Sequence, residues 1–307
     1  MTAARIILHG KAAANADVRK AVAVLRERGH AIEVRVTWES GDAARLAREA
    51  VADARAGTVA TIIAGGGDGT INEVFASAYR AGLPQACVLG VLPLGTANDF
   101  AHSTLIPVAD MTAALELALE GTARPIDVAL VDGRPFVNVL SGGFGSRVTV
   151  ETDPELKKRL GGLAYVLTGV TRFSELSASR GRFTAPDFSW EGPFLAVAIG
   201  NGRQAGGGIP LCPDAMLDDG MLDLMVMPEL DRAARLDAFA ALLRGGVDSL
   251  RAQLVTTRAP WIVYEAEEPL HVNLDGEPMK LKRFRAECVA GALSVRLGDT
   301  PLVSPAA

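Results

Sequence analysis

The chain has 307 residues; 49% of them are hydrophobic and 22% are charged, and 31 basic against 36 acidic side chains give a formal net charge of -5. This apolar fraction can fill a sizeable core, which excludes a disordered or fibrous protein, and the length favours about two domains. The acidic balance, without a long basic run, excludes a general nucleic-acid-binding protein, so nucleic acid is not an expected partner.

The first 123 or so residues alternate β-rich runs with stretches of helical periodicity. Strands are expected over 5–8, 32–36, 58–64 and 88–92, and helices over 17–28, 43–56 and 71–80. Apolar strands that alternate with helices predict a parallel sheet covered on both faces. Because ligands of such sheets bind beyond the carboxyl ends of the strands, the loops after Ala64 and Leu92 are the first candidates for a site.

The loop after the third expected strand reads GGGDGT, from Gly65 to Thr70. Successive glycines let backbone N–H groups approach an anion, and the following helix adds a partial positive charge, so we expect a phosphate site. The spacing fits neither a P-loop nor a G-x-G-x-x-G fingerprint. A plain turn with a capping box between Thr70 and Glu73 is the alternative. Asp68 favours the phosphate site, because a carboxylate beside phosphates implies an intervening Mg2+ ion.

The loop after the fourth expected strand reads PLGTANDF, from Pro93 to Phe100, and should lie at the same edge of the sheet. Its Thr96, Asn98 and Asp99 supply hydroxyl, amide and carboxylate groups. A turn with Thr96 as a helix N-cap explains the loop equally well on its own. Thr37, at the end of the second strand, belongs to the same edge, and a hydroxyl that caps a turn is its alternative role.

Beyond residue 123 the pattern changes to closely spaced strand candidates joined by turn signals. They cover 126–131, 136–140, 194–199, 221–227, 261–265, 270–274 and 293–297, with helical stretches at 154–173 and 230–243. This pattern predicts a mostly antiparallel, β-rich domain. The expected architecture is therefore an α/β domain over 1–123 and an antiparallel, sandwich-like domain over 124–307. Whether the last residues pack back on the first domain is left open.

Two acidic segments of the second region are site candidates. The segment from Leu211 to Asp223 is rich in aspartate but lacks EF-hand spacing, and a solvated turn is its alternative. The NLDGEP segment reads first as a hairpin turn. It also places Asp275 and Glu277 on either side of one glycine, so that one carboxylate could take a proton from a hydroxyl that attacks a phosphoryl group.

The remaining features concern location. Three widely spaced cysteines suggest neither disulfides nor zinc, and the sequence shows no signal peptide, so a reducing cytoplasm is expected. The longest uncharged run, 81–98, contains two prolines and several glycines, which excludes a membrane-spanning helix. Two basic clusters are either solvated or in contact with anionic lipid: one comprises Lys280, Lys282, Arg283 and Arg285, the other Lys157, Lys158 and Arg159.

GGGDGT and PLGTANDF together resemble the two signatures of the diacylglycerol-kinase catalytic-domain family. The similarity extends through 34–45, 142–147, 200–208 and 272–278, and these longer motifs resemble most closely the bacterial lipid kinases of that family. The resemblance implies a two-domain enzyme that uses ATP and Mg2+ to phosphorylate a lipid hydroxyl. One departure is His9-Gly10-Lys11, where many members have Asn-Pro after the first strand, so a phosphate contact there is not expected.

The resemblance also implies roles for individual residues. Nucleotide contacts are expected at Thr37, Gly65, Gly66, Gly67, Asp68, Gly69, Thr70, Ile71, Asn72, Glu73 and Thr96. Catalytic roles are expected for Asp68, Asp99, Asp275 and Glu277, with Glu277 as the first choice of proton acceptor. A second cation, Mg2+ or Ca2+, is expected on the Asp219 carboxylate and the carbonyls of Met216 and Met221.

The sequence thus predicts a cytoplasmic, ATP- and Mg2+-dependent lipid kinase that contacts the membrane peripherally and reversibly. Two alternatives stay open: an NAD kinase, which shares a GGDGT-type loop, and an inactive regulator that binds nucleotide or lipid. The sequence does not identify the lipid.

Overall fold

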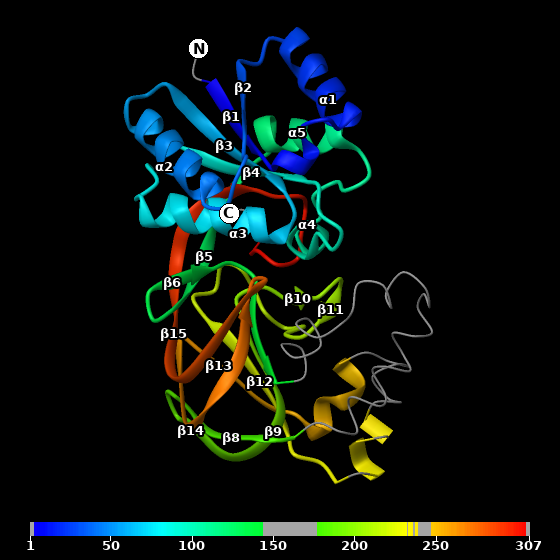
Figure 1. Ribbon diagram of the computed structural model, residues 1–307, viewed down its shortest axis with the longest axis vertical. Helices are drawn as coiled ribbons and strands as arrows, with labels where there is room; N and C mark the ends of the chain where they lie inside the picture. Colours follow the sequence, from blue (N-terminus) through cyan, green and yellow to red (C-terminus); the bar gives the residue numbers. More distant parts are fainter. Residues whose placement is uncertain (1–2, 144–176, 232, 236, 239–246, 305–307) are drawn as a thin grey trace.

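The computed structural model describes residues 3–143, 177–231, 233–235, 237–238 and 247–304 (Figure 1). The first region contains β1 (Ala3–Leu8), η1 (Gly10–Ala12), α1 (Ala16–Glu27), β2 (Ile32–Val36), α2 (Asp42–Arg55), β3 (Val59–Gly66), α3 (Asp68–Arg80), β4 (Val88–Pro93), α4 (Asp99–Ser103) and α5 (Met111–Glu120). Every strand and helix predicted for this region is present. The predicted α/β class with a parallel sheet is confirmed.

The parallel strands follow the order β2-β1-β3-β4. The chain reverses its direction across the sheet between β1 and β3, so right-handed connections place α1 on one face and both α2 and α3 on the other. Accordingly α1 packs with α5, and α2 packs with α3. Such a reversal creates a crevice beyond the carboxyl ends of β1 and β3, which is where the GGGDGT loop begins.

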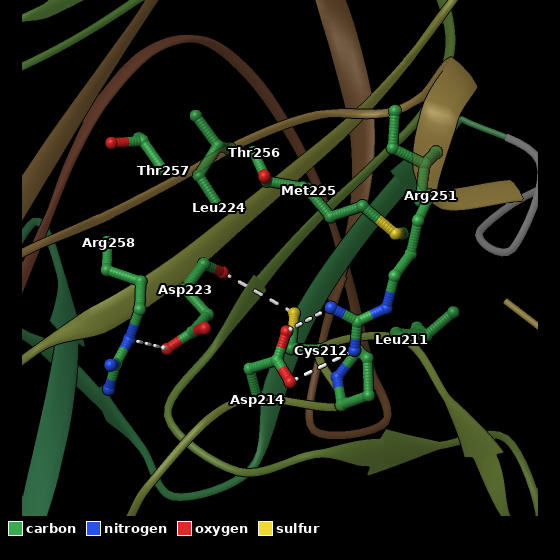
Figure 2. A pocket seen from close by; sticks show the side chains of 12 residues that line it. Leu211, Cys212, Asp214, Asp223, Leu224, Met225, Arg251, Thr256, Thr257 and Arg258 are labelled. Atoms are coloured by element: carbon green, nitrogen blue, oxygen red, sulfur yellow. Dashed lines mark hydrogen bonds and ion pairs between the residues drawn. The ribbon is translucent and has the colours of Figure 1, made fainter. Parts of the chain in front are cut away.

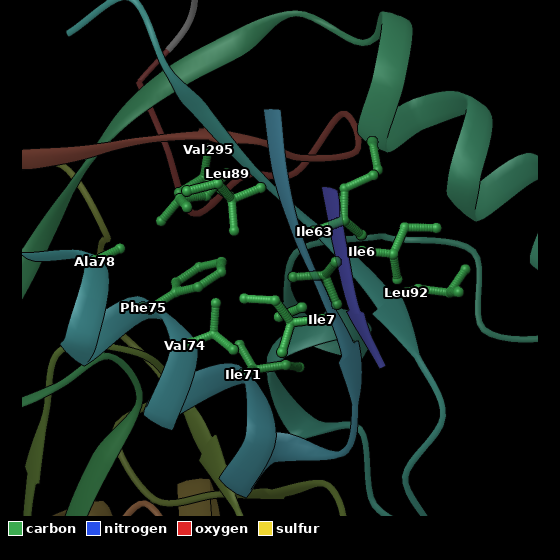
Figure 3. Packing of buried hydrophobic residues seen from close by; sticks show 14 of the residues in the cluster. Ile6, Ile7, Ile63, Ile71, Val74, Phe75, Ala78, Leu89, Leu92 and Val295 are labelled. Carbon is green, nitrogen blue, oxygen red and sulfur yellow. The ribbon is translucent and has the colours of Figure 1, made fainter. Parts of the chain in front are cut away.

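Apolar periodicity explains how the helices attach to the sheet. In α1 the buried side chains are Val18, Ala21, Val22 and Leu25, which form one stripe, and the Asn15 side chain caps its first turn. Figure 3 shows the corresponding face of α3 against the sheet, with the side chains of Ile71, Val74, Phe75 and Ala78 directed at Ile7, Leu89 and Val295.

The second region is antiparallel, as predicted. It contains β5 (Ala123–Val131), β6 (Arg134–Phe136), β7 (Val139–Gly143), β8 (Ser179–Ala185), β9 (Phe188–Gly200), β10 (Gln204–Ala205), β11 (Ile209–Pro210), β12 (Leu222–Pro228), η2 (Val247–Gln253), β13 (Val255–Ala259), β14 (Trp261–Leu274) and β15 (Glu277–Arg296). Stacked aromatic rings fill its core; the Phe183 and Tyr264 centroids are 4.9 Å apart, and those of Tyr264 and Phe284 are 5.2 Å apart.

One predicted strand is wrong in an informative way. The run 136–140 was expected to be continuous, but β6 ends at Phe136, β7 begins at Val139, and Val137 and Asn138 form a bend between them. The backbone N–H groups of this bend do not join a strand ladder. They bind the Asp275 carboxylate instead, and that competing acceptor breaks the strand.

The two regions share one sheet. The long strand β15 pairs with β14 and β5 and reaches β4 through Val295 and Leu89. Leu302 and Val303, near the end of the chain, belong to the core cluster of the first region. The last described residues therefore pack on the first region. The boundary at residue 123 stays a prediction, and β5 starts there.

Several expectations fall outside the described residues. These are the helix over 154–173, the cluster of Lys157, Lys158 and Arg159, and most of the motif over 142–147. Of the helix over 230–243, the described residues 233–235 and 237–238 are helical. In the described part of the chain, no helix has the length and apolar character needed to cross a membrane.

Candidate active site

The loops predicted to carry the chemistry meet at one edge of the parallel sheet. The GGGDGT loop follows β3, PLGTANDF follows β4, and Thr37 follows β2 (Figure 1). Leu94 donates its backbone N–H to the Gly66 carbonyl at 2.8 Å, which joins the first two loops directly. The expectation that these segments lie side by side is therefore confirmed by the geometry.

The GGGDGT loop enters α3 earlier than expected. The helix begins at Asp68 with Gly67 as its N-cap, so Thr70 lies within the first turn. The alternative capping box between Thr70 and Glu73 is wrong, because the Glu73 carboxylate accepts instead from the Ala44 N–H of α2 at 3.2 Å. Thr70 packs over Gly66, where a Cβ would lie 2.5 Å from the Thr70 hydroxyl oxygen.

The amino terminus of α3 is open to a ligand. Gly67 offers no side-chain cap, and the N–H groups of Asp68, Gly69 and Thr70 have no acceptor among the described residues. A Cβ built on Gly69 would meet no atom within 4 Å. Unpaired N–H groups and the positive end of the helix dipole favour an anion at this position.

Thr37 is held against the turn after β1. Its hydroxyl oxygen accepts from the Gly10 N–H at 3.1 Å, and a Cβ at Gly10 would clash with the Thr37 carbonyl oxygen. His9 accepts from the Lys11 N–H through Nδ1 at 3.2 Å and so caps η1. His9-Gly10 therefore serves as a capped turn that brings the backbone close to Thr37.

The PLGTANDF loop is closed by Asn98 rather than by Thr96. Asn98 lies in the left-handed region at φ 52, and its side chain accepts from the Gly95 N–H at 2.8 Å and donates to the Gly95 carbonyl at 3.0 Å. Thr96 is exposed and does not cap α4, whose N-cap is Asn98. The Thr96 hydroxyl is thus available to a ligand.

The carboxylates of Asp68 and Asp99, one in each loop, differ in how many of their oxygens are free to bind a ligand. One oxygen of Asp68, Oδ1, accepts from the Phe100 N–H at 3.0 Å, and Oδ2 has no partner among the described residues. Asp99 is buried, and its carboxylate accepts from the Gly207 N–H at 3.0 Å and the Gly208 N–H at 2.5 Å. Mg2+ binds through one or two carboxylates together with phosphate oxygens, so the free oxygen of Asp68 fits a nucleotide-bound Mg2+ better than Asp99 does.

Asp275 is bound by the bend between β6 and β7. Its carboxylate accepts from the N–H groups of Val137 at 2.8 Å, Asn138 at 3.0 Å and Val139 at 2.8 Å. Burial raises the pKa of Asp275 to about 6 against the effect of these donors, and the charge of Asp68 raises it further. Asp68 and Asp275, from the two regions, are therefore within electrostatic reach of each other.

Glu277 occupies a different environment. It is exposed at the start of β15, and its side chain makes no hydrogen bond to a described residue. Of the predicted pair, only the Asp275 carboxylate is held in place by hydrogen bonds to described residues.

The predicted cation turn already holds a positive charge. One oxygen of Asp219 accepts from the Met221 N–H at 3.0 Å, and the other forms an ion pair with Arg258. Arg258 also binds Asp223 at 3.2 Å, and the Met216 side chain contacts Arg203. A divalent cation on Asp219 does not fit beside this guanidinium unless Arg258 moves.

Beside that turn lies a cavity of about 180 Å³ (Figure 2). Figure 2 shows Arg258 paired with Asp223, and Arg251 paired with Asp214, on its walls. Burial raises the pKa of Asp223 to about 6, and Arg258 partly offsets this.

Two of the four side chains in the basic cluster of β15 already bind other residues of the protein. Arg283 pairs with Glu265 at 3.5 Å, and Arg285 lies 4.6 Å from the Trp261 ring centre and 3.4 Å from Glu287. The side chains left without a described partner in this cluster are Lys280 and Lys282, and both are exposed.

Sequence reasoning missed Asn138, Gly207 and Gly208, whose N–H groups bind carboxylates, and Asn201, whose side chain binds the Val137 carbonyl. The run of glycines at 206–208 was a usable signal, because all three take positive φ values of 72, 91 and 91°. Asn201 lies in the motif over 200–208, whereas no local signal marked Asn138.

Comparison with known proteins gives a consistent result. Residues 4–131 match the model of the diacylglycerol kinase catalytic domain, and residues 138–297 match the YegS C-terminal NAD kinase beta sandwich-like domain. The "Probable lipid kinase YegS-like" of Pseudomonas aeruginosa is 53% identical over 97% of this chain and 95% of its own length. That of Xanthomonas campestris is 48% identical over 98% of each. A solved diacylglycerol kinase from Bacillus anthracis superposes with a TM-score of 0.77 at 25% identity over 97% of both chains.

Proposed function

The chain belongs to the YegS-like lipid kinases of the diacylglycerol kinase family, and we propose from this that it transfers the γ-phosphate of ATP to a hydroxyl of a membrane lipid with Mg2+. One structural observation supports this proposal independently of the family relationship. A carboxylate with a raised pKa, Asp275, lies within electrostatic reach of Asp68 at the open amino terminus of α3. A proton acceptor beside an anion site is what transfer of phosphate to an alcohol requires.

The nucleotide phosphates are proposed to lie on the free N–H groups of Asp68, Gly69 and Thr70. Thr37 and Thr96 would contact the rest of the nucleotide from the adjoining loops. Mg2+ held by Asp68 would neutralise charge on the phosphates. Asn72 and Glu73 act less directly, because Asn72 is buried and Glu73 is bound to α2.

Asp275 is proposed as the general base in place of Glu277. The lipid hydroxyl gives its proton to the Asp275 carboxylate while its oxygen bonds to the γ-phosphorus. The bond from that phosphorus to the bridging oxygen breaks, and ADP leaves. A pKa near 6 keeps Asp275 ionised at neutral pH yet basic enough to take a proton, whereas the exposed Glu277 is not held in place.

We further propose a cytoplasmic enzyme that meets its lipid by peripheral, reversible contact with the membrane. Lys280 and Lys282 are available for anionic headgroups. Two other outcomes stay distinguishable: phosphorylation of NAD would indicate an NAD kinase, and ATP binding without turnover would indicate a regulator.

The proposal is tested by incubating the protein with labelled ATP, Mg2+ and an extracted lipid mixture, with NAD in a parallel reaction. Labelled lipid is expected with wild type and with Glu277→Gln. Asp275→Asn should lose roughly 10²-fold or more in turnover while it still binds ATP. If Glu277→Gln loses turnover and Asp275→Asn does not, Glu277 is the base. If no lipid is labelled by wild type, the kinase assignment is rejected.

A further inference from the structure

The Asp275 carboxylate is bound by a bend whose N–H groups are not stabilised by strand pairing. Three successive N–H groups, those of Val137, Asn138 and Val139, converge on it. Because these donors turn away from the strand ladder, other groups must fix the bend from behind.

Asn138 and Asn201 provide that support. The Asn138 carbonyl accepts from the Asn201 N–H at 2.9 Å and the Gly202 N–H at 2.7 Å, and the Asn201 side chain donates to the Val137 carbonyl at 2.9 Å. The Asn138 side chain donates to the Gln204 carbonyl at 2.6 Å. Asn138 is therefore bound at three points: its N–H binds Asp275, and its carbonyl and side chain bind the segment 201–204.

Gln204 begins the short hairpin of β10 and β11, which leads to the first region. The turn of this hairpin donates the Gly207 and Gly208 N–H groups to Asp99. Asp99 precedes Phe100, whose N–H binds Asp68. Hydrogen bonds and short backbone links thus connect Asp275 through Asn138 and the hairpin to Asp99 and the phosphate loop.

Packing favours a specific role for Asn138 over generic stabilisation. Asn138 is 6% exposed, and its Oδ1 has no hydrogen-bond partner among the described residues. A Cβ at Gly202 would clash with that oxygen, so the side chain is enclosed. Enclosing an unpaired acceptor costs free energy, and such costs concentrate where geometry serves function.

We propose that Asn138 is a positioning residue that, through its side-chain bond to the hairpin, holds the Asp275 carboxylate in register with the phosphate loop. The inference rests on the proposed function of Asp275. Removing the side chain frees the bend from Gln204, and the three donors then no longer fix the carboxylate. ATP binding is unaffected, because Asn138 makes no hydrogen bond to Thr37, to the GGGDGT loop or to Thr96.

The test is a double-mutant cycle of Asn138→Ala and Asp275→Asn, with kcat and the KM for ATP measured for all four proteins. Asn138→Ala should lower kcat roughly 10- to 100-fold, as expected when a reactive group shifts by about 1 Å, and leave the KM for ATP within about twofold. In the Asp275→Asn background the same change should have no further effect beyond about twofold. Multiplicative effects, or an unchanged kcat, would overturn the proposal.

Hydrogen exchange supplies a readout that needs no activity. The amides of Val137 to Val139 should exchange faster in Asn138→Ala than in wild type, and equal exchange would reject the role of Asn138. If wild type labels no lipid, the proposed function fails, while this measurement still decides whether Asn138 holds the bend. Asn138→Ser replaces Asn138→Ala if the alanine variant does not fold.

Tyr264→Phe is the matched control. It removes a buried hydroxyl from the same region that also lacks a described hydrogen-bond partner, within the aromatic core. Its kcat, KM and exchange at Val137 to Val139 should match wild type. A loss of kcat in this control equal to that in Asn138→Ala would show that any buried polar change disturbs the site.

Discussion

Gly67 and Gly95 approach each other so closely that a Cβ on Gly95 would lie 2.5 Å from the Gly67 Cα. This contact joins the GGGDGT and PLGTANDF loops where the phosphates are proposed to bind. Neither residue has a positive φ, so the requirement for glycine is one of space.

Gly95→Ala should therefore push the two loops apart and weaken ATP binding by about tenfold or more, measured by calorimetry. Gly67→Ala, whose Cβ would lie 3.0 Å from the Gly95 Cα, should act in the same direction more mildly. Gly192→Ala is the control, because its Cβ would meet the Trp190 ring at 3.2 Å in the other region. Unchanged ATP affinity in a folded Gly95→Ala protein would contradict the phosphate assignment.

The pKa of Asp275 predicts how stability varies with pH. In the folded protein the pKa of Asp275 is about 6, whereas the ordinary pKa of an aspartate is 3.8. The stability gained from the protonated carboxyl is full below about pH 4 and is lost as pH rises through 6, an effect of at most about 3 kcal/mol.

Urea unfolding between pH 4 and pH 7 checks this expectation. Asp275→Asn should remove that part of the pH dependence, and the difference between the two proteins at each pH isolates Asp275 from Asp223, which titrates in the same range. Asp68→Asn should move the transition to lower pH, because one source of repulsion is lost. Parallel stability curves for wild type and Asp275→Asn would refute the assignment.

Arg258 and a divalent cation are expected to compete for Asp219. Arg258→Met removes the guanidinium, so added Mg2+ or Ca2+ should raise the melting temperature of this variant more than that of wild type. A further Asp219→Asn change should abolish the gain. Arg251→Met is the control, since that arginine lines the same cavity but pairs with Asp214. Equal metal responses in all four proteins would leave the turn without a cation.

Membrane contact is expected to be electrostatic and reversible. Lys280→Glu combined with Lys282→Glu should weaken binding to anionic vesicles, because these two lysines have no described partner. Added salt should release wild type from such vesicles. Lys20→Glu, with Lys20 exposed on α1, is the control for a change of charge elsewhere. Binding that survives high salt or ignores lipid charge would contradict the expectation.

Local sequence determined the first region of this protein. Apolar periodicity and glycine runs depend on near neighbours, and they predicted β1 to β4, α1 to α3 and the loops that meet beyond β3 and β4, but not η1, α4 or α5. The antiparallel class of the second region also followed from its turns and strand patterns, but β8, β13 and most of β15 were not predicted.

Tertiary structure decided the roles of the acidic residues. Sequence placed Asp275 and Glu277 in one turn and ranked Glu277 first, whereas the fold supplies three N–H donors to the Asp275 carboxylate from a bend more than 130 residues away and none to the Glu277 carboxylate. These contacts interrupt the strand expected over 136–140. Another long-range contact places Arg258 beside Asp219. Burial and hydrogen bonding of a carboxylate depend on segments that become neighbours only on folding, so no local pattern encodes them.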